Sequence, residues 1–113
     1  MSKQILTSQI IEKQLKNANA EFDGYIIDHN QLFNEIIDFE ELANIDFSFR
    51  NCKFTGFISL HNLVFNGRVH FSRNEFDNLI DFTNCKFHNN IFFRGNVLKS
   101  LVIEDCELNN MVE

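Results

Sequence analysis

Large apolar residues recur at a fixed period in the middle of the chain. From Phe54 to Leu98 an eleven-residue pattern is repeated four times, and its large apolar positions alternate at steps of six and five residues. One column of these positions contains Phe54, Phe65, Phe76, Phe87 and Leu98. The other contains Leu60, Phe71, Phe82 and Phe93, each preceded two positions earlier by Ile58, Val69, Ile80 or Ile91. One such unit cannot bury its own apolar face and must stack on its neighbours, which predicts a repeat architecture.

The spacing within each unit predicts short strands rather than helices. A helix needs apolar residues at positions i, i+3, i+4 and i+7, whereas residues two apart in a strand share one face. Pairs such as Ile58 and Leu60 alternate for a single step, after which Asn or Gly follows, as in Gly95–Asn96. Asn and Gly tolerate the left-handed conformations that a corner requires. The sequence therefore predicts an all-β protein of short strands joined by corners, with the apolar pairs pointing inward.

Two segments carry a resemblance to a known family. The sequences NCKFTG at 51–56 and NCKFHN at 84–89, with a looser copy SRNEFD at 72–77, resemble the pentapeptide-repeat family, over about residues 43–103. The resemblance implies a right-handed, quadrilateral β-helix, a solenoid of about four turns in which each five-residue unit makes one face. The six-residue steps depart from the family pattern, so that one turn takes 22 residues rather than 20.

A 22-residue turn predicts which side chains stack. The expected stacks are Phe49 with Phe71 and Phe93, Phe54 with Phe76 and Leu98, Leu60 with Phe82, and Phe65 with Phe87. Offset-stacked rings contribute about 0.5–1.5 kcal/mol per pair beyond their buried area. The composition of fourteen Phe and no Trp suits a narrow axis with room for one flat ring per face in each turn.

The 113 residues are expected to form one domain, with an N-terminal segment at 1–21 and the repeat at 22–113. The N-terminal segment is either a capping helix over about 7–17, with Thr7 or Ser8 as its N-cap, or a degenerate first repeat that places Ile11 and Leu15 in the apolar columns. Covering the end of a solenoid prevents its free strand edges from recruiting other chains.

The repeat has irregularities at both ends. The segment 21–33 matches 75–87 in spacing, which aligns Phe22 with Phe76 and places Asp28 where Phe82 stands, so a bulge that lets Ile27 point inward is expected. Between residues 33 and 43 one residue is missing from the period. Near the C-terminus another is missing, so that Ile103 and Leu108 become the inward centres.

The sequence contains no recognisable catalytic or cofactor motif. Cys52, Cys85 and Cys106 lack the paired short spacing of a zinc site, and each stands two residues before a centre, where a small buried side chain belongs. The four histidines share no ligand-like spacing and are expected at the surface. No phosphate-binding loop or nucleophile elbow is present. We therefore predict a protein that is not an enzyme and that holds no metal or cofactor.

Charge is the remaining functional signal. The net charge is −6, and residues 21–46 contain eight acids and no Lys or Arg. A solvated face explains such a segment, and so does an acidic surface that occupies a groove built for a polyanion. The resembled family includes proteins that imitate DNA and bind DNA gyrase, and small phage-borne inhibitors such as anti-CRISPR proteins use the same device. We expect a non-enzymatic protein-binding module, an acidic DNA mimic that inhibits a basic, nucleic-acid-handling bacterial enzyme, with a scaffold solenoid without mimicry as the alternative. The expected contact residues are Glu35, Asp38, Glu40 and Glu41.

Other expectations concern assembly and location. Apolar residues at the C-terminal end predict a homodimer interface formed by Leu101, Ile103, Leu108, Met111 and Val112. Seven basic residues are spread over 47–103 without an aromatic platform on an exposed face, so direct nucleic-acid binding is not expected. No apolar run suits a membrane span, and the unpaired cysteines suit a reducing compartment. We expect the cytoplasm of a bacterium, or of its host if the chain is phage-encoded.

Overall fold

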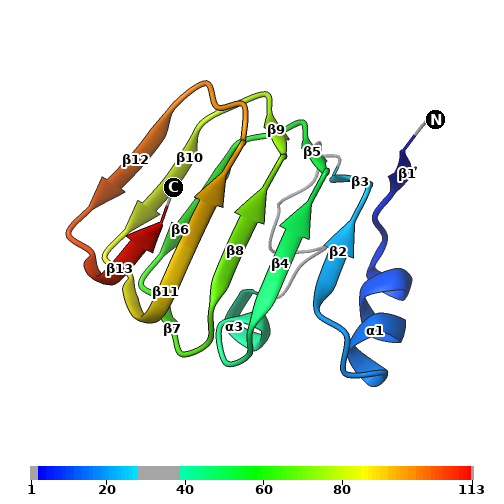
Figure 1. The fold of residues 1–113 in the computed structure, drawn as a ribbon, viewed down its shortest axis with the longest axis horizontal. Helices are drawn as coiled ribbons and strands as arrows, with labels where there is room; N and C mark the ends of the chain where they lie inside the picture. Colours follow the sequence, from blue (N-terminus) through cyan, green and yellow to red (C-terminus); the bar gives the residue numbers. More distant parts are fainter. Residues whose placement is uncertain (1–2, 28–38, 113) are drawn as a thin grey trace.

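The computed structural model of the protein describes residues 3–27 and 39–112. Over these residues the chain is mostly β-strand, arranged in three parallel sheets, with two helices (Figure 1). The prediction of an all-β protein built from short strands is therefore confirmed.

From β5 to β11, successive strands along the chain belong to the first, the second and the third sheet in turn. The first sheet contains β1 (Gln4–Ile5), β3 (Tyr25–Ile27), β5 (Lys53–Phe54) and β9 (Glu75–Phe76). The second contains β6 (Ile58–His61), β10 (Ile80–Thr83) and β12 (Leu101–Glu104). The third contains β2 (Glu21–Asp23), β4 (Phe47–Arg50), β7 (Val64–Phe65), β8 (Val69–Ser72), β11 (Lys86–Arg94) and β13 (Glu107–Val112).

The central strands pair with a constant register of 22 residues. Phe49 is aligned with Phe71, which is aligned with Phe93. Leu60 is aligned with Phe82 in the second sheet. Glu75 is aligned with Val97, which precedes Leu98 and is also 22 residues further along the chain. We call one such period a layer. In the last layer the step shortens, so that Phe82 is aligned with Ile103. The predicted 22-residue alignment of the central layers and the missing residue near the C-terminus are confirmed. Leu98, which was expected to stack with Phe76, is instead 38% exposed.

The core is a set of stacked aromatic rings. Four rings, those of Phe22, Phe49, Phe71 and Phe93, form a continuous stack with centroid distances of 5.1, 5.6 and 5.2 Å. Two further stacks join Phe54 to Phe76 at 4.6 Å and Phe65 to Phe87 at 4.8 Å. Neighbouring stacks meet edge to face, an arrangement that aromatic pairs favour. The smaller inward residues Ile58, Val69, Ile80 and Ile91 fill the remaining space and are buried.

The corners use the left-handed backbone conformation. One corner column contains Gly24, Asn51, Arg73 and Gly95, whose φ angles are 81°, 52°, 55° and 64°. A second contains Asn62, Asn84 and Asp105, with φ angles of 61°, 55° and 52°. Gly, Asn and Asp enter this region at low cost, but a long side chain such as that of Arg73 does so rarely.

A ladder of buried asparagines ties one corner column to the sheet. Asn74 is 1% exposed, and its Oδ1 accepts a hydrogen bond from the backbone N–H of Cys52 at 2.9 Å. Its Nδ2 donates to the carbonyl oxygen of Phe49 at 2.9 Å. In the next layer Asn96 repeats both contacts, accepting from the backbone N–H of Asn74 and donating to the carbonyl oxygen of Phe71. The asparagines therefore satisfy backbone groups that the short strands leave unpaired.

A helix covers the N-terminal end. Helix α1 spans Ser8–Lys16, and the Thr7 side chain caps it by accepting from the backbone N–H of Ile10 at 3.3 Å. It lies beside β2 (Figure 1), where Gln14 Nε2 donates to the carbonyl oxygen of Glu21 at 2.9 Å. Ile11 is buried against the core. Of the two interpretations of the N-terminal segment, the helical one agrees with the structure.

The first layer departs from the predicted alignment. Phe22 is aligned with Phe49 and Ile27 with Phe54, so the match of Phe22 to Phe76 was wrong. Ile27 does point inward, and it is fully buried. It reaches that position by the ordinary five-residue step from Phe22, and the residue expected to bulge, Asp28, lies outside the described residues.

The first layer contains more residues than each of the central layers. The register between Ile27 and Phe54 is 27 residues, five more than in the central layers. The predicted missing residue between 33 and 43 falls largely outside the described residues and stays a prediction. A short helix, α3 (Phe39–Leu42), ends this longer segment, and Leu42 and Ala43 are buried in the core.

Removing one ring from the central stack should destabilise the fold strongly. We expect Phe71→Ala to lower the free energy of unfolding by about 3–5 kcal/mol, because Phe49 and Phe93 hold the cavity open from both sides. Phe57 is 54% exposed, so Phe57→Ala is the matched control and should cost little. Urea unfolding monitored by circular dichroism measures both, and equal midpoints would contradict the stacked core.

Removing the buried amide of Asn74 should also be costly. In Asn74→Ala the backbone N–H of Cys52 and the carbonyl of Phe49 lose their partners, and each unsatisfied buried group costs about 1–3 kcal/mol. We therefore expect a loss of at least about 2 kcal/mol in urea unfolding. Asn78→Ala is the control, because Asn78 makes its hydrogen bond to the carbonyl oxygen of Thr55 at an exposed corner. A loss no larger than that of the control would show that the ladder does not stabilise the fold.

Candidate functional site

The acids of residues 21–46 do not form one face separated from positive charge. Asp23 is aligned with Arg50 in the third sheet, and its carboxylate accepts a hydrogen bond from Asn51 Nδ2 at 3.0 Å. Asp46 accepts from the backbone N–H of Arg68 at 2.7 Å. Asp23 and Asp46 have no basic neighbour in the sequence, but in the fold the next layer places a basic residue or a hydrogen-bond donor beside each of them.

The predicted acidic contact residues are only partly described. Glu40 and Glu41 are exposed and lie next to each other on α3. Glu35 and Asp38 lie outside the described residues. Among the described acids of residues 21–46, Glu21, Glu40 and Glu41 are exposed, and Asp23 and Asp46 accept hydrogen bonds from later layers.

The C-terminal end has exposed strand edges and apolar side chains. Within the described chain, β12 pairs only with β10 and β13 only with β11, so each has one free edge. Leu101 and Ile103 are half-buried, and Leu108 is 41% exposed. The backbone of Met111 and Val112 lies in β13, and their side chains are outside the described set. The predicted interface residues that are described therefore lie at one end of the molecule.

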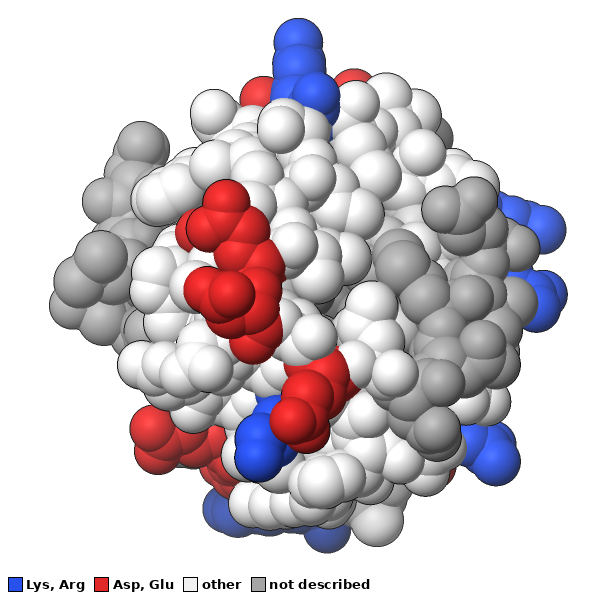
Figure 2. All heavy atoms as spheres, turned by 90° about the vertical axis from the view of Figure 1, so that its left-hand side faces the viewer, with Lys and Arg blue, Asp and Glu red and all other residues white. Residues whose placement is uncertain are grey.

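Acidic side chains cross this C-terminal end. Figure 2 shows the end as a mainly uncharged surface with Asp and Glu side chains lying over it. Glu104, Asp105 and Glu107 are exposed on the last layer, and Glu107 forms an ion pair with Lys86 at 3.9 Å. Charged side chains of this kind discourage unspecific pairing of a strand edge.

The cysteines behave as core residues. Cys52 and Cys85 are buried, and burial raises the pKa of both thiols. Cys106 is half-buried near the C-terminal end, and its sulfur accepts a hydrogen bond from the backbone N–H of Cys85 at 3.4 Å. Among the described residues no three His, Cys, Asp or Glu side chains are grouped so as to hold a metal ion.

Sequence reasoning missed a cluster of arginines. A shallow hollow of about 570 Å³ lies at one corner of the third sheet, and it is lined by three arginines and one aspartate. Its lining residues are Asp23, Arg50, Asn51, His70, Ser72, Arg73, Arg94 and Gly95. Arg50, Ser72 and Arg94 stand in register on neighbouring strands, about 4.8 Å apart from one strand to the next. The 22-residue spacing of these three residues was the signal that could have revealed the cluster.

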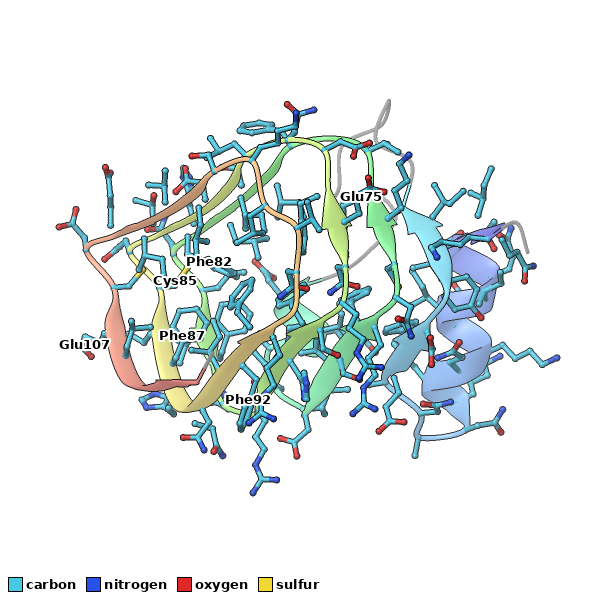
Figure 3. The ribbon with its side chains drawn as sticks, turned by 45° about the horizontal axis from the view of Figure 1, so that its top comes forward. Glu75, Phe82, Cys85, Phe87, Phe92 and Glu107 are labelled. Atoms are coloured by element: carbon cyan, nitrogen blue, oxygen red, sulfur yellow. The ribbon has the colours of Figure 1, made fainter. Side chains whose placement is uncertain are left out.

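The arginines of the hollow share it with Asp23 but form no ion pair with it or with another described acid. Within the described part of the chain, ion pairs are formed by Lys53, His61 and Lys86 and not by these arginines. Arg94 lies over the ring of Phe92, 5.8 Å from its centroid, which orients the guanidinium group. Phe92 projects from the outer side of β11 (Figure 3), whereas Phe82 and Phe87 point into the core.

The positive charges of two arginines affect His70, which lies on the same face of the sheet. His70 stacks on Phe92 with centroids 5.2 Å apart. Burial lowers the pKa of the His70 imidazole, and the positive charges of Arg50 and Arg94 lower it further against the opposing charge of Glu21. His70 is therefore neutral near pH 7 and can both donate and accept a hydrogen bond.

A second, smaller hollow of about 130 Å³ continues along the same face. It shares Arg50 and His70 with the first, and Glu21, Asp46 and Arg68 bring both signs of charge to its rim. Ser48 also lines it and is 5% exposed, and its hydroxyl has no hydrogen-bond partner among the described residues. The two hollows together form a continuous polar strip on the outer face of β4 and β8.

Comparison with known proteins finds no family model, no curated protein and no solved structure that matches this chain. The described residues include no helix with the length and apolar character needed to cross a membrane.

Proposed function

We propose that the chain is a non-enzymatic protein-binding module of the pentapeptide-repeat type, a right-handed, four-sided β-solenoid that associates with a second copy through its C-terminal end. The parallel sheets and the 22-residue register support the solenoid part of the proposal. The observation that carries the binding part is the pair of free edges on β12 and β13, with half-exposed apolar residues beside them.

A second copy is the occupant that fits this end. The N-terminal end has α1 beside β2, whereas no described element lies beyond β12 and β13 (Figure 1). A two-fold axis brings the same apolar patch and the same strand edges of the two copies together, so one surface provides both halves of the interface. It also brings Glu104 and Asp105 of the two copies near each other. The association should therefore strengthen as salt screens this repulsion.

A charge introduced at the C-terminal end should prevent association. We expect wild type to be a dimer at high micromolar concentration and Leu108→Asp to be a monomer, because the new carboxylate would be buried without a partner in the interface. Light scattering measures the mass. Leu108 is 41% exposed, so the variant should keep the melting temperature of an isolated wild-type chain.

Val64→Asp is the matched control for this experiment, because Val64 is 44% exposed on β7, away from the C-terminal end. It should leave the dimer intact. The half-buried Cys106 thiol gives an independent measurement, since maleimide labelling of Cys106 should slow as the protein concentration rises. A wild-type monomer at every concentration would overturn the proposed self-association.

Mimicry of DNA is the second candidate function. It rests on Glu40 and Glu41, which α3 exposes at the end of the segment that lengthens the first layer. Two adjacent carboxylates can steer the chain toward the basic groove of a nucleic-acid-handling protein, such as a gyrase-type topoisomerase or a CRISPR effector. The acids that lie beside Arg50 and Arg68 contribute less to such a field. This distribution favours the scaffold form of the proposal over a uniform DNA mimic.

Charge reversal on α3 separates the two candidates. If the chain is a mimic, Glu40→Lys with Glu41→Lys should slow binding to proteins captured from a bacterial lysate and flatten its salt dependence, and duplex DNA should compete with the captured complex. The melting temperature should change little. Glu12→Lys with Glu75→Lys is the control, since it changes the net charge equally at exposed sites outside α3 and outside the last two strands. Unchanged binding by the α3 variant, without competition by DNA, would contradict mimicry and leave the scaffold proposal standing.

A further inference from the structure

We propose that the polar strip on the outer face of β4 and β8 is a binding site for a small phosphate monoester whose organic part carries hydroxyl groups. The strip consists of the larger hollow around Arg50, Arg73 and Arg94 and the smaller hollow around Ser48. The proposal is independent of self-association and of the acids on α3.

An excess of positive charge is the first argument. Three arginines line the larger hollow together with one acid, Asp23, whose carboxylate accepts a hydrogen bond from Asn51 Nδ2 at 3.0 Å. Like charges that are brought together from three successive layers repel one another, and an anion removes this repulsion. A guanidinium group can donate two parallel hydrogen bonds to the oxygens of one phosphate. A water molecule or a monatomic anion cannot accept both bonds in this geometry.

The backbone of Arg73 is the second argument. Its φ angle is 55°, in a corner column whose other members are Gly24, Asn51 and Gly95. A long side chain is disfavoured there, so Arg73 is strained in a way that its neighbours in the column are not. The Cγ of Arg73 lies 3.5 Å from where a Cβ would stand on Gly95. The stem of the Arg73 side chain therefore lies over Gly95, the residue that follows Arg94 in the chain.

The smaller hollow indicates what the rest of the ligand carries. The Ser48 hydroxyl is buried without a partner, and buried polar groups are almost always hydrogen-bonded. Glu21 and Asp46 at the rim accept hydrogen bonds, and the neutral His70 can donate or accept. These groups suit uncharged hydroxyls. The same carboxylates repel a second phosphate, so the strip suits a compact monoester better than the repeated phosphates of a nucleic-acid backbone.

The size of the strip agrees with this chemistry. A hollow of about 570 Å³ is in the range of small-molecule sites, although this one is shallow and open to solvent. An open site with three arginines should bind with modest affinity, with a Kd of about 1 mM or tighter.

The test is a titration of the full chain with three probes, in which binding is monitored by the chemical shifts of the backbone amides. We expect saturable binding of inorganic phosphate, tighter binding of ribose 5-phosphate, and weaker binding of a single-stranded oligothymidylate per phosphate. The shifts should map to β4, β8 and β11. No saturable binding of either small probe would overturn the proposal. Oligothymidylate binding tighter than ribose 5-phosphate would also overturn it, because it would identify the strip as a nucleic-acid surface.

Two variants separate a binding role from a structural one. Arg73→Gly should keep or raise the melting temperature, because it relieves the left-handed backbone, and should weaken phosphate binding by about tenfold or more, as expected for the loss of one charge-assisted contact. Arg94→Gln should weaken it similarly with the fold intact. Lys99→Gln is the control, since Lys99 is an exposed cation outside both hollows. Binding unaffected by both arginine variants, or weakened equally by the control, would overturn the assignment.

Discussion

Stacking of one aromatic ring on another is the interaction on which the rest of this structure depends. Parallel strands lie about 4.8 Å apart, and the stacked rings in the core lie 4.6–5.6 Å apart. The backbone ladder and the ring stack therefore share one repeat distance, so each stabilises the register of the other. A shift of one residue would move every ring from the core to the solvent face. The six- and five-residue steps are therefore kept in the central layers, and departures from them occur in the first and last layers.

The same constraint explains which features of the fold could be predicted from the sequence. The stacks of the central layers follow directly from the period, because Phe49, Phe71 and Phe93 have the same spacing to their neighbours in the chain. The first layer was misaligned because both apolar columns contain Phe, so Phe22 fits either one by type. Only the pairing of Ile27 with Phe54 distinguishes them, across a segment that is five residues longer than the period. The role of Asn74 was also hidden, since a corner residue and a buried ladder residue look alike in a sequence.

The charges show why the candidate site was harder to predict than the fold. Along the chain, acids precede bases and the two groups look separate. In a parallel stack, however, each residue lies beside the residue one layer away, so Asp23 lies beside Arg50 and Asp46 beside Arg68. A linear count of charge therefore does not reveal that Asp23 and Asp46 have donor groups beside them in the fold. It also missed the arginine cluster, because its members are far apart in sequence and come together only through the register of the outward-facing positions.

The fold restricts the residue type least at the outward positions of the strands and at the corners that do not need a positive φ angle. Inward positions must be filled by rings and aliphatic side chains, and most corners need Gly, Asn or Asp to reach a positive φ angle. Arg73 satisfies neither requirement, since it is a long side chain at a corner, where the left-handed conformation costs about 1–2 kcal/mol. The packing of the core gains nothing from its guanidinium group, which faces the hollow shared with Arg50 and Arg94. A residue that strains the backbone and brings like charges together works against folding at that corner, so its contribution has to be sought on the outer face of the sheet, in what the guanidinium group can bind.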